Sequence, residues 1–314
     1  MQAYAAKILQ EVQKAVVGKD EILAKVLMAI LAGGHILLED IPGVGKTTLA
    51  LAFSRAMQLS CKRLQFTPDV LPADVTGFSV YQKATGKLVY QPGAVLCNLF
   101  LADEINRTSS KTQSALLEVM EEGRVTVDGI THETPKPFTV IATQNPVGSA
   151  GTQLLPESQM DRFMIRLSMG YPAMQDEVEI LDRKREGDPL LLVQPVANAQ
   201  NMLDMQQQVQ AVYCSRELLE YIVRLADATR ESPLLKLGVS PRGSLAVARL
   251  ARACAWLSGR DYVVPKDIRL IFSDACCHRV LLSPQAKLGG RTAGQILNDI
   301  LQDTESPALE RKSR

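Results

Sequence analysis

The sequence predicts an α/β fold built on a parallel sheet and followed by an all-helical domain. Up to about residue 170, apolar strand-like runs alternate with helical segments, which is typical of a parallel sheet with helices on both faces. A glycine-rich turn joins the first of these strands to the helix behind it. After Tyr171-Pro172 no clear strand is apparent and helical patterns follow one another. We therefore expect two domains that meet near residue 170.

The first half of the chain supplies the predicted sheet and its helices. Apolar residues recur at helical spacing from Ala5 to Val16 and predict an opening amphipathic helix. A second helix is expected from Asp20 to the Gly33-Gly34 pair, since glycines commonly end helices. Strands are expected at the apolar runs 36–39, 64–66, 99–102 and 138–143, and helices at 47–58 and 111–121.

Two hairpins are predicted as insertions into this alternation. The first pairs residues 78–81 with 88–90 across the turn KATGK. The second pairs 124–127 with 130–133 across Asp128-Gly129. An Asp-Gly pair between alternating residues is a strong hairpin signal because both turn positions need positive φ.

The second half reads as helices at 178–185, 204–212, 216–231, 243–257 and 265–282. We divide the chain into an α/β domain over 1–170, a helical domain over 171–304 and a flexible tail over 305–314. The tail is charged and poor in apolar residues, so it cannot bury enough surface to order itself.

Composition excludes several classes of protein. The 314 residues carry 35 Lys and Arg against 34 Asp and Glu, a net charge of +1, which speaks against a strongly basic nucleic-acid surface. The N-terminus lacks the continuous apolar stretch of a secretory signal, and no apolar run is long enough for a transmembrane helix. None of the six cysteines forms a C-x-x-C pair, so we expect reduced thiols and a cytoplasmic protein.

A phosphate-binding loop is expected where the first strand ends. Residues 40–47 read DIPGVGKT and nearly match G-x-x-x-x-G-K-[ST]. Gly43 and Gly45 let backbone N–H groups curl around phosphate oxygens, and the helix that follows turns its positive end to the anion. Lys46 would reach the β- and γ-phosphates of ATP, and Thr47 would ligate Mg²⁺. The remaining expected contacts are Pro42, Val44 and Thr48.

One position departs from this pattern. Asp40 stands where the pattern has its first glycine. Aspartate tolerates positive φ better than most residues. It nevertheless brings a carboxylate close to the expected phosphates, and the sequence does not show where that charge points.

Two carboxylates end a second apolar strand. Asp103 and Glu104 follow the run LFLA, and the carboxyl ends of parallel strands meet at the edge of the sheet that binds ligands. In a protein with a phosphate loop, we expect Asp103 to orient Mg²⁺ and Glu104 to activate the attacking water.

A third strand ends in an amide. Asn145 follows the apolar run at 138–143 and could orient the same water and sense the γ-phosphate. A turn-forming Asn before Pro146 explains the same spacing equally well.

With these strand ends in order, the chain resembles an AAA+ ATPase, and more narrowly the MoxR family. The resemblance rests on EDIPGVGKTTLA, FLADEINRTSSKTQSALLEVMEEGRVTVDG, ATQNPVGSAGTQLLPESQMDRF and VSPRG, which occur in this order over residues 39–243. It implies a P-loop AAA+ sheet domain in which the two hairpins are the insertions of this clade, followed by an all-helical lid.

The resemblance also implies residue roles. Val17-Gly18 resembles the segment that lines the adenine, and Asn145 resembles sensor 1. Arg162 resembles the arginine finger, which acts on the ATP of a neighbouring subunit. Arg242 resembles sensor 2, on the lid of the same subunit. Arg107 and Arg166 are alternative candidates for the finger.

By this resemblance the protein is a Mg²⁺-dependent ATPase that remodels or matures partner proteins, including by insertion of metals or cofactors. The family resemblance implies a homo-oligomeric ring, expected to be a hexamer, and a partner with a von Willebrand factor A domain. A nucleic-acid motor or ATP-dependent regulator is the alternative, although the 5% aromatic content offers few stacking side chains. A nucleotide-bound scaffold is a third, and the presence of Glu104, Asn145 and Arg162 argues against it.

Overall fold

The central sheet of the computed structural model has five parallel strands in the order β2-β5-β8-β1-β9. The structure describes residues 1–41, 43–145, 155–185 and 187–307. The strands are β1 (Ile36–Glu39), β2 (Cys61–Gln65), β5 (Leu99–Asp103), β8 (Thr139–Gln144) and β9 (Ile165–Leu167). β1, β5 and β8 were predicted closely, whereas β2 begins three residues before the strand expected at 64–66. The fifth, β9, was missed because three residues interrupted by an arginine carry no periodic signal.

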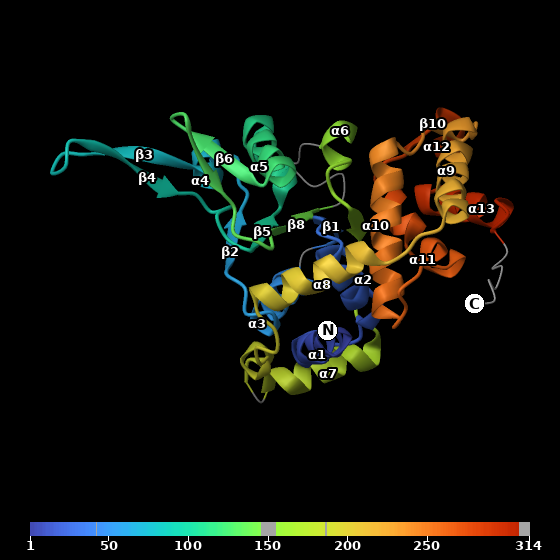
Figure 1. The fold of residues 1–314 in the computed structure, drawn as a ribbon, viewed down its shortest axis with the longest axis horizontal. Coiled ribbons are helices and arrows are strands. Elements are labelled where there is room, and N and C mark those ends of the chain that lie inside the picture. Colours follow the sequence, from blue (N-terminus) through green and yellow to red (C-terminus); the bar gives the residue numbers. More distant parts are fainter. Residues whose placement is uncertain (42, 146–154, 186, 308–314) are drawn as a thin grey trace.

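Helices cover both faces of this sheet (Figure 1). Alternate residues of β5 enter opposite clusters, since Leu99 and Leu101 pack with α1 (Gln2–Ala15), α2 (Asp20–Leu31) and α3 (Lys46–Ala56). Phe100 and Ala102 pack with the apolar face of α5 (Ser110–Glu122). This is the two-residue alternation of a strand buried on both sides.

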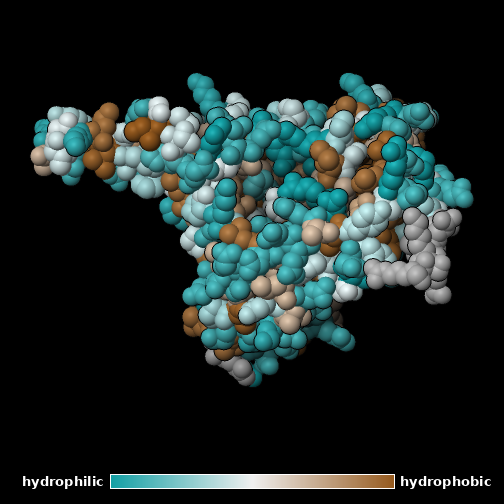
Figure 2. Space-filling view, in the orientation of Figure 1, coloured by the Kyte–Doolittle hydropathy of each residue, from teal (hydrophilic) through white to brown (hydrophobic). Residues whose placement is uncertain are grey.

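Both predicted hairpins are present. They are β3 (Gly77–Gln82) with β4 (Lys87–Pro92), and β6 (Arg124–Val127) with β7 (Ile130–Glu133). The first reaches out from the body of the molecule, and apolar side chains on it, including Tyr81 and Leu88, are exposed (Figures 1 and 2). Tyr90 stacks on His132 of the second hairpin at 3.8 Å between ring centroids, so it is not free to stack on a base.

The C-terminal part is mainly helical. Its helices are α7 (Met174–Arg185), α8 (Ala199–Ala211), α9 (Arg216–Glu231), α10 (Pro241–Leu257), α11 (Pro265–Cys276), α12 (Pro284–Leu288) and α13 (Ala293–Asp303). Two strands that the sequence did not predict, β10 (Leu235–Leu237) and β11 (Leu281–Leu282), pair antiparallel. The helix expected over 265–282 therefore ends at Cys276.

The short helical elements of the whole chain are α4 (Pro72–Thr76), α6 (Glu157–Met160), η1 (Ile105–Arg107) and η2 (Pro189–Leu192).

The hydrophobic core runs without a break across the boundary proposed near residue 170. Leu27 of α2, Met205 of α8 and Val247 of α10 belong to one buried cluster. The predicted tail over 305–314 falls outside the described residues beyond residue 307. Within the described ranges, no helix has the length and apolar composition that a membrane span requires.

Candidate nucleotide site

The phosphate loop has the backbone that its glycines predict. Gly43 and Gly45 have φ of +87° and +92°, a region that residues with a Cβ rarely adopt. Gly45 is the N-cap of α3, so the free N–H groups of that helix begin at Lys46. Val44, Thr47 and Thr48 are half-buried around this turn, and Pro42 lies outside the described residues.

Lys46 is buried within this loop. Its side chain is 8% exposed, and Nζ donates to the Asp40 carbonyl at 2.8 Å. Burial lowers the pKa of Lys46, while the nearby carboxylates of Asp40, Asp103 and Glu104 act in the opposite direction. The Lys46 ammonium therefore lies among acidic groups at the start of α3.

The structure shows where the Asp40 carboxylate points. It accepts hydrogen bonds from Ser168 Oγ at 3.1 Å, from the Gly170 N–H at 3.1 Å and from the Met169 N–H, all just after β9. Asp40 does not have positive φ. The sequence suggested that the Asp40 carboxylate would oppose phosphate binding. This penalty is avoided, because the three donors after β9 satisfy the charge of the carboxylate.

Asp103 is fixed at the end of β5 with both carboxylate oxygens occupied. Thr143 of β8 donates its hydroxyl to Oδ1 at 2.6 Å. Arg63 of β2 donates to Oδ2 from a terminal nitrogen at 2.7 Å and from Nε at 3.2 Å. Arg63 was not among the expected site residues, because the strand predicted from the sequence begins one residue after it, at Leu64.

Asp103 and Thr47 suit the Mg²⁺ that the family resemblance implies. Both offer the hard oxygen ligands that this ion prefers, and Mg²⁺ is commonly held by one or two protein groups together with phosphates and water. Among the described residues no group of three or more His, Cys, Asp or Glu could hold a metal by itself. The donors present therefore fit a metal that arrives with a nucleotide.

Glu104 is held beside Asp103 by three donors. Its Oε1 accepts from Asn145 Nδ2 at 3.0 Å, and its Oε2 accepts from Gln65 Nε2 at 2.8 Å and from Arg107 at 3.0 Å. Glu104 has φ of +56°, and its N–H donates to Thr143 Oγ1 at 2.8 Å. A non-glycine residue in the left-handed region of φ/ψ space raises the free energy of the folded state. Such strained residues are common at functional sites.

Asn145 lies at Glu104. Its side chain is buried, and its backbone carbonyl accepts from Asn106 Nδ2 at 3.2 Å. We call the set of residues 40–41, 43–48, Asp103, Glu104 and Asn145 the phosphate crevice, after the ligand that the sequence predicts for it.

The expected adenine segment contacts the first helix of the C-terminal part. Gly18 has φ of +68°, and a Cβ there would lie 2.0 Å from a carboxylate oxygen of Asp176 in α7. Lys19 Nζ donates to the Tyr171 carbonyl at 2.9 Å. Val17-Gly18 therefore lies against the start of the predicted lid.

Arg162 and Arg242 meet at a single carboxylate. Glu121, in the last turn of α5, contacts Arg162 through Oε2 at 2.9 Å and Arg242 through Oε1 at 2.5 Å. We call these three residues the arginine face. A cavity of about 300 Å³ adjoins it, lined by Ser114, Leu117, Glu118, Glu121, Glu122, Gln159 and Arg162. Arg242, expected over the nucleotide of its own subunit, thus lies beside the predicted finger.

The turn that carries Arg162 is fixed by the helical part of the chain. Arg279, which is almost fully buried, donates to Asp161 Oδ1 at 2.6 Å and to the Phe163 carbonyl at 2.6 Å. Ser240, the N-cap of α10, donates to the other Asp161 oxygen at 2.9 Å. The same contacts bring the start of α10, and hence Arg242, close to Arg162.

The two alternative finger candidates are paired near the crevice of their own chain. Arg107 contacts Glu104, as described above. Arg166 contacts Glu39 at 2.7 Å and the Cys277 sulfur at 3.3 Å. Both arginines are therefore engaged within the subunit that carries them.

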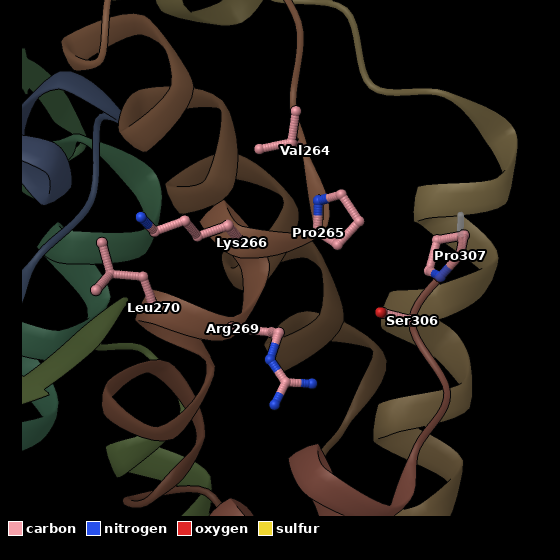
Figure 3. Close-up of a pocket in the computed structure, with 7 residues that line it drawn as sticks. All are labelled: Val264, Pro265, Lys266, Arg269, Leu270, Ser306 and Pro307. Atoms are coloured by element: carbon pink, nitrogen blue, oxygen red, sulfur yellow. The ribbon is translucent and has the colours of Figure 1, made fainter. Parts of the chain in front are cut away.

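A separate cavity lies in the helical part of the chain (Figure 3). It has a volume of about 580 Å³ and lies between the start of α11 and the C-terminal segment. Its lining contains none of the predicted site residues and consists of Val264, Pro265, Lys266, Arg269, Leu270, Ser306 and Pro307.

Comparison with known proteins identifies relatives over almost the whole chain. Residues 35–165 match the ATPase family associated with various cellular activities (AAA), and residues 227–300 match the AAA lid domain. The chain is 46% identical to YeaC of Bacillus subtilis (strain 168), over 96% of this chain and 94% of that protein. It is 37% identical to Chaperone MoxR1 of Mycobacterium tuberculosis, over 95% of this chain and 81% of that protein.

A solved structure agrees with the fold. The crystal structure of a putative ATPase from Cytophaga hutchinsonii matches with a TM-score of 0.90 and 35% sequence identity. The match covers 98% of this chain and 96% of that one.

Proposed function

Since the chain belongs to the MoxR family of AAA+ ATPases, we propose that it hydrolyses ATP with Mg²⁺ and uses the energy to remodel partner proteins. The observation that carries the proposal is the arrangement of Glu104. Its carboxylate follows Asp103 at the end of β5 and is oriented by Asn145, Gln65 and Arg107. A general base needs such positioning to accept a proton from an attacking water.

Each group of residues in the crevice has its own role in the proposed reaction. The N–H groups of the phosphate loop and the Lys46 ammonium bind the phosphates of ATP. Thr47 and Asp103 would hold Mg²⁺, which supplies positive charge against the phosphate oxygens. Glu104 accepts the proton of the attacking water, and Asn145 keeps the Glu104 carboxylate in place.

The arginine face supplies the second half of the site from another subunit. Arg162 and Arg242 are held together, on a carboxylate outside the phosphate crevice of their own chain. We therefore propose that both act on the ATP of a neighbour within a homo-oligomeric ring, which the family resemblance suggests is a hexamer. Guanidinium groups suit this role because they bind phosphate oxygens through two parallel hydrogen bonds.

The client is a protein. The relative in Mycobacterium tuberculosis bears the name of a chaperone, and the family resemblance suggests a partner with a von Willebrand factor A domain. Maturation of that partner by metal or cofactor insertion is one form that the remodelling can take.

Mixing two inactive variants tests the proposal. Lys46→Ala should abolish ATP binding, and Arg162→Ala should bind ATP but hydrolyse it roughly 10³-fold more slowly, at the lower end for arginine fingers. Mixed rings should recover part of the turnover, because an intact crevice on the Arg162 variant can meet an intact finger from the Lys46 variant. Mixed rings that form but stay inactive would exclude action in trans. Retained ATP affinity in Lys46→Ala would exclude the phosphate loop.

A further inference from the structure

Arg63 has no direct step in the proposed reaction, although it donates to Gln65 Oε1 at 2.9 Å, and it occupies the carboxylate that the reaction needs. Two of its nitrogens donate to the same oxygen of Asp103, at 2.7 and 3.2 Å. Thr143 takes the other oxygen at 2.6 Å. Asp103 has therefore no oxygen without a partner in this structure.

The placement of Arg63 on its strand makes this contact specific. β2 is the edge strand of the sheet, and in the parallel register Arg63 lies opposite Leu101, whereas Gln65 lies opposite Asp103. The Arg63 side chain must therefore extend forward along the sheet to reach Asp103. An arginine at a sheet edge could extend into water instead, where its side chain would keep more conformational freedom.

The charge around Asp103 indicates what this contact does. Arg63 is 48% exposed while Asp103 is 12% exposed, so the cation can leave toward solvent and the carboxylate cannot. Metal and guanidinium compete for the same oxygen, because a carboxylate oxygen that accepts two charge-assisted hydrogen bonds has little capacity left for a metal or for its water.

We propose that Arg63 is a built-in counter-cation of Asp103 that must withdraw before a magnesium–nucleotide complex can use this carboxylate. Arg63 thereby sets the Mg²⁺ concentration at which nucleotide binds tightly. This rests on the proposed ATPase function and adds a residue that tunes it. Removing Arg63 frees the carboxylate, so less Mg²⁺ is needed.

The chain offers a matched control. Arg107 pairs with Glu104 as Arg63 pairs with Asp103, and its side chain is 42% exposed on a carboxylate that is 17% exposed. Arg107→Gln removes the same charge from the same crevice without freeing Asp103. It is a control for Mg²⁺-dependent nucleotide binding alone and not for turnover, since Arg107 orients Glu104 in the proposed reaction. A change in the general electrostatic potential would affect both variants, whereas competition for Asp103 affects Arg63→Gln alone.

The experiment measures nucleotide affinity, not turnover. Binding of a fluorescent N-methylanthraniloyl-ATP is followed by anisotropy over a series of free Mg²⁺ concentrations. For Arg63→Gln we expect the Mg²⁺ concentration at half-maximal affinity to fall roughly 3- to 10-fold, the range for loss of a partly exposed, charge-assisted pair. For Arg107→Gln we expect a change of less than about 2-fold, because its carboxylate is not the metal ligand.

Two further variants keep the test decisive. Arg63→Lys retains the charge but donates from one nitrogen, so its midpoint should lie between those of wild type and Arg63→Gln. It carries the test if Arg63→Gln does not fold, as thermal unfolding would show. Asp103→Asn should shift the midpoint in the opposite direction, toward more Mg²⁺, since an amide is a weaker ligand.

Three results would overturn the inference while leaving the ATPase proposal intact. One is an unchanged midpoint in folded Arg63→Gln and Arg63→Lys. Another is an equal shift in Arg107→Gln, which would indicate a general charge effect. The third is weaker binding of Arg63→Gln at every Mg²⁺ concentration, which would place Arg63 on the phosphates. Failure of the wild-type protein to bind the probe at any Mg²⁺ concentration would instead overturn the proposed function and this inference with it.

Discussion

The phosphate crevice and the arginine face both contain arginine–carboxylate ion pairs, but the two regions differ in which partner comes from several segments of the chain. In the crevice, strand ends fix two carboxylates, and Arg63 and Arg107 come to them from β2 and η1. At the arginine face, one carboxylate on a helix end gathers two arginines from separate segments of the chain. The crevice therefore has acidic groups of fixed position, whereas the arginine face has basic groups of fixed position.

This difference bears on which part of the proposed site can work within one subunit. The crevice holds its loop, Lys46 and the proposed base Glu104 in place without a partner. The arginine face is neutralised by its own Glu121. In the proposed ring, the phosphates of a neighbouring nucleotide would displace that carboxylate, because they carry more negative charge.

The largest effect is expected in the crevice. Glu104→Gln keeps the shape of the side chain but cannot accept the proton of the attacking water, so turnover should fall at least about 10²-fold while ATP affinity persists. Steady-state hydrolysis and nucleotide anisotropy on the same preparation measure both. Glu220→Gln, which breaks an exposed pair with Arg216 on α9, is the control and should leave turnover unchanged. Turnover within a few-fold of wild type in Glu104→Gln would require another base.

An intermediate effect is expected at His35, which joins β8, the strand before Asn145, to α5, the helix that carries Glu121. Its Nδ1 accepts from the Val140 N–H at 3.0 Å in β8, and its Nε2 faces the Met120 carbonyl at 2.9 Å, next to Glu121. Nε2 is therefore the protonated nitrogen of a neutral ring. Burial lowers the pKa of His35 from 6.5 to about 4.

The sign of the pH dependence follows from this shift. The unfolded chain binds a proton below about 6.5 and the folded chain only near 4, so the contribution is complete above 6.5 and is lost as the pH falls toward 4. At pH 5 we expect the free energy of unfolding to be about 2 kcal/mol lower than at pH 8 on this account. His35→Gln can make both hydrogen bonds without titrating. Urea unfolding of both proteins at the two pH values should show the extra loss in wild type alone, and equal losses would exclude His35 as its source.

The smallest effect is expected at the arginine face. Glu121→Gln removes the charge that competes with a neighbour's phosphates, so the protein concentration needed for half-maximal specific ATPase activity should fall about 3-fold, as expected for weak, partly exposed pairs. Glu122→Gln is the matched control, because Glu122 pairs with Arg124 instead. If Glu121→Gln required more protein, Glu121 would be positioning the arginines and not masking them.

Asp40 shows how a local pattern can mislead. The sequence places a carboxylate where the phosphate-loop pattern has glycine, and this suggests a penalty for binding an anion. The contacts that remove the penalty come from residues 168–170, which follow the short strand β9. Because β9 carries no periodic signal, neither the strand nor its contacts with Asp40 could be predicted.

The strands β1, β5 and β8, the phosphate loop, both hairpins and the acids at the end of β5 could be predicted, because they depend on local spacing and on residue type. The partners of those acids and of the arginines follow only from how distant segments pack. Arg63 meets Asp103 through the pairing of β2 with β5, and Arg242 meets Glu121 because Ser240 and Arg279 both hold Asp161. Such meetings join residues 40 to 121 positions apart in the chain, where local patterns carry no information and only packing sets the distance.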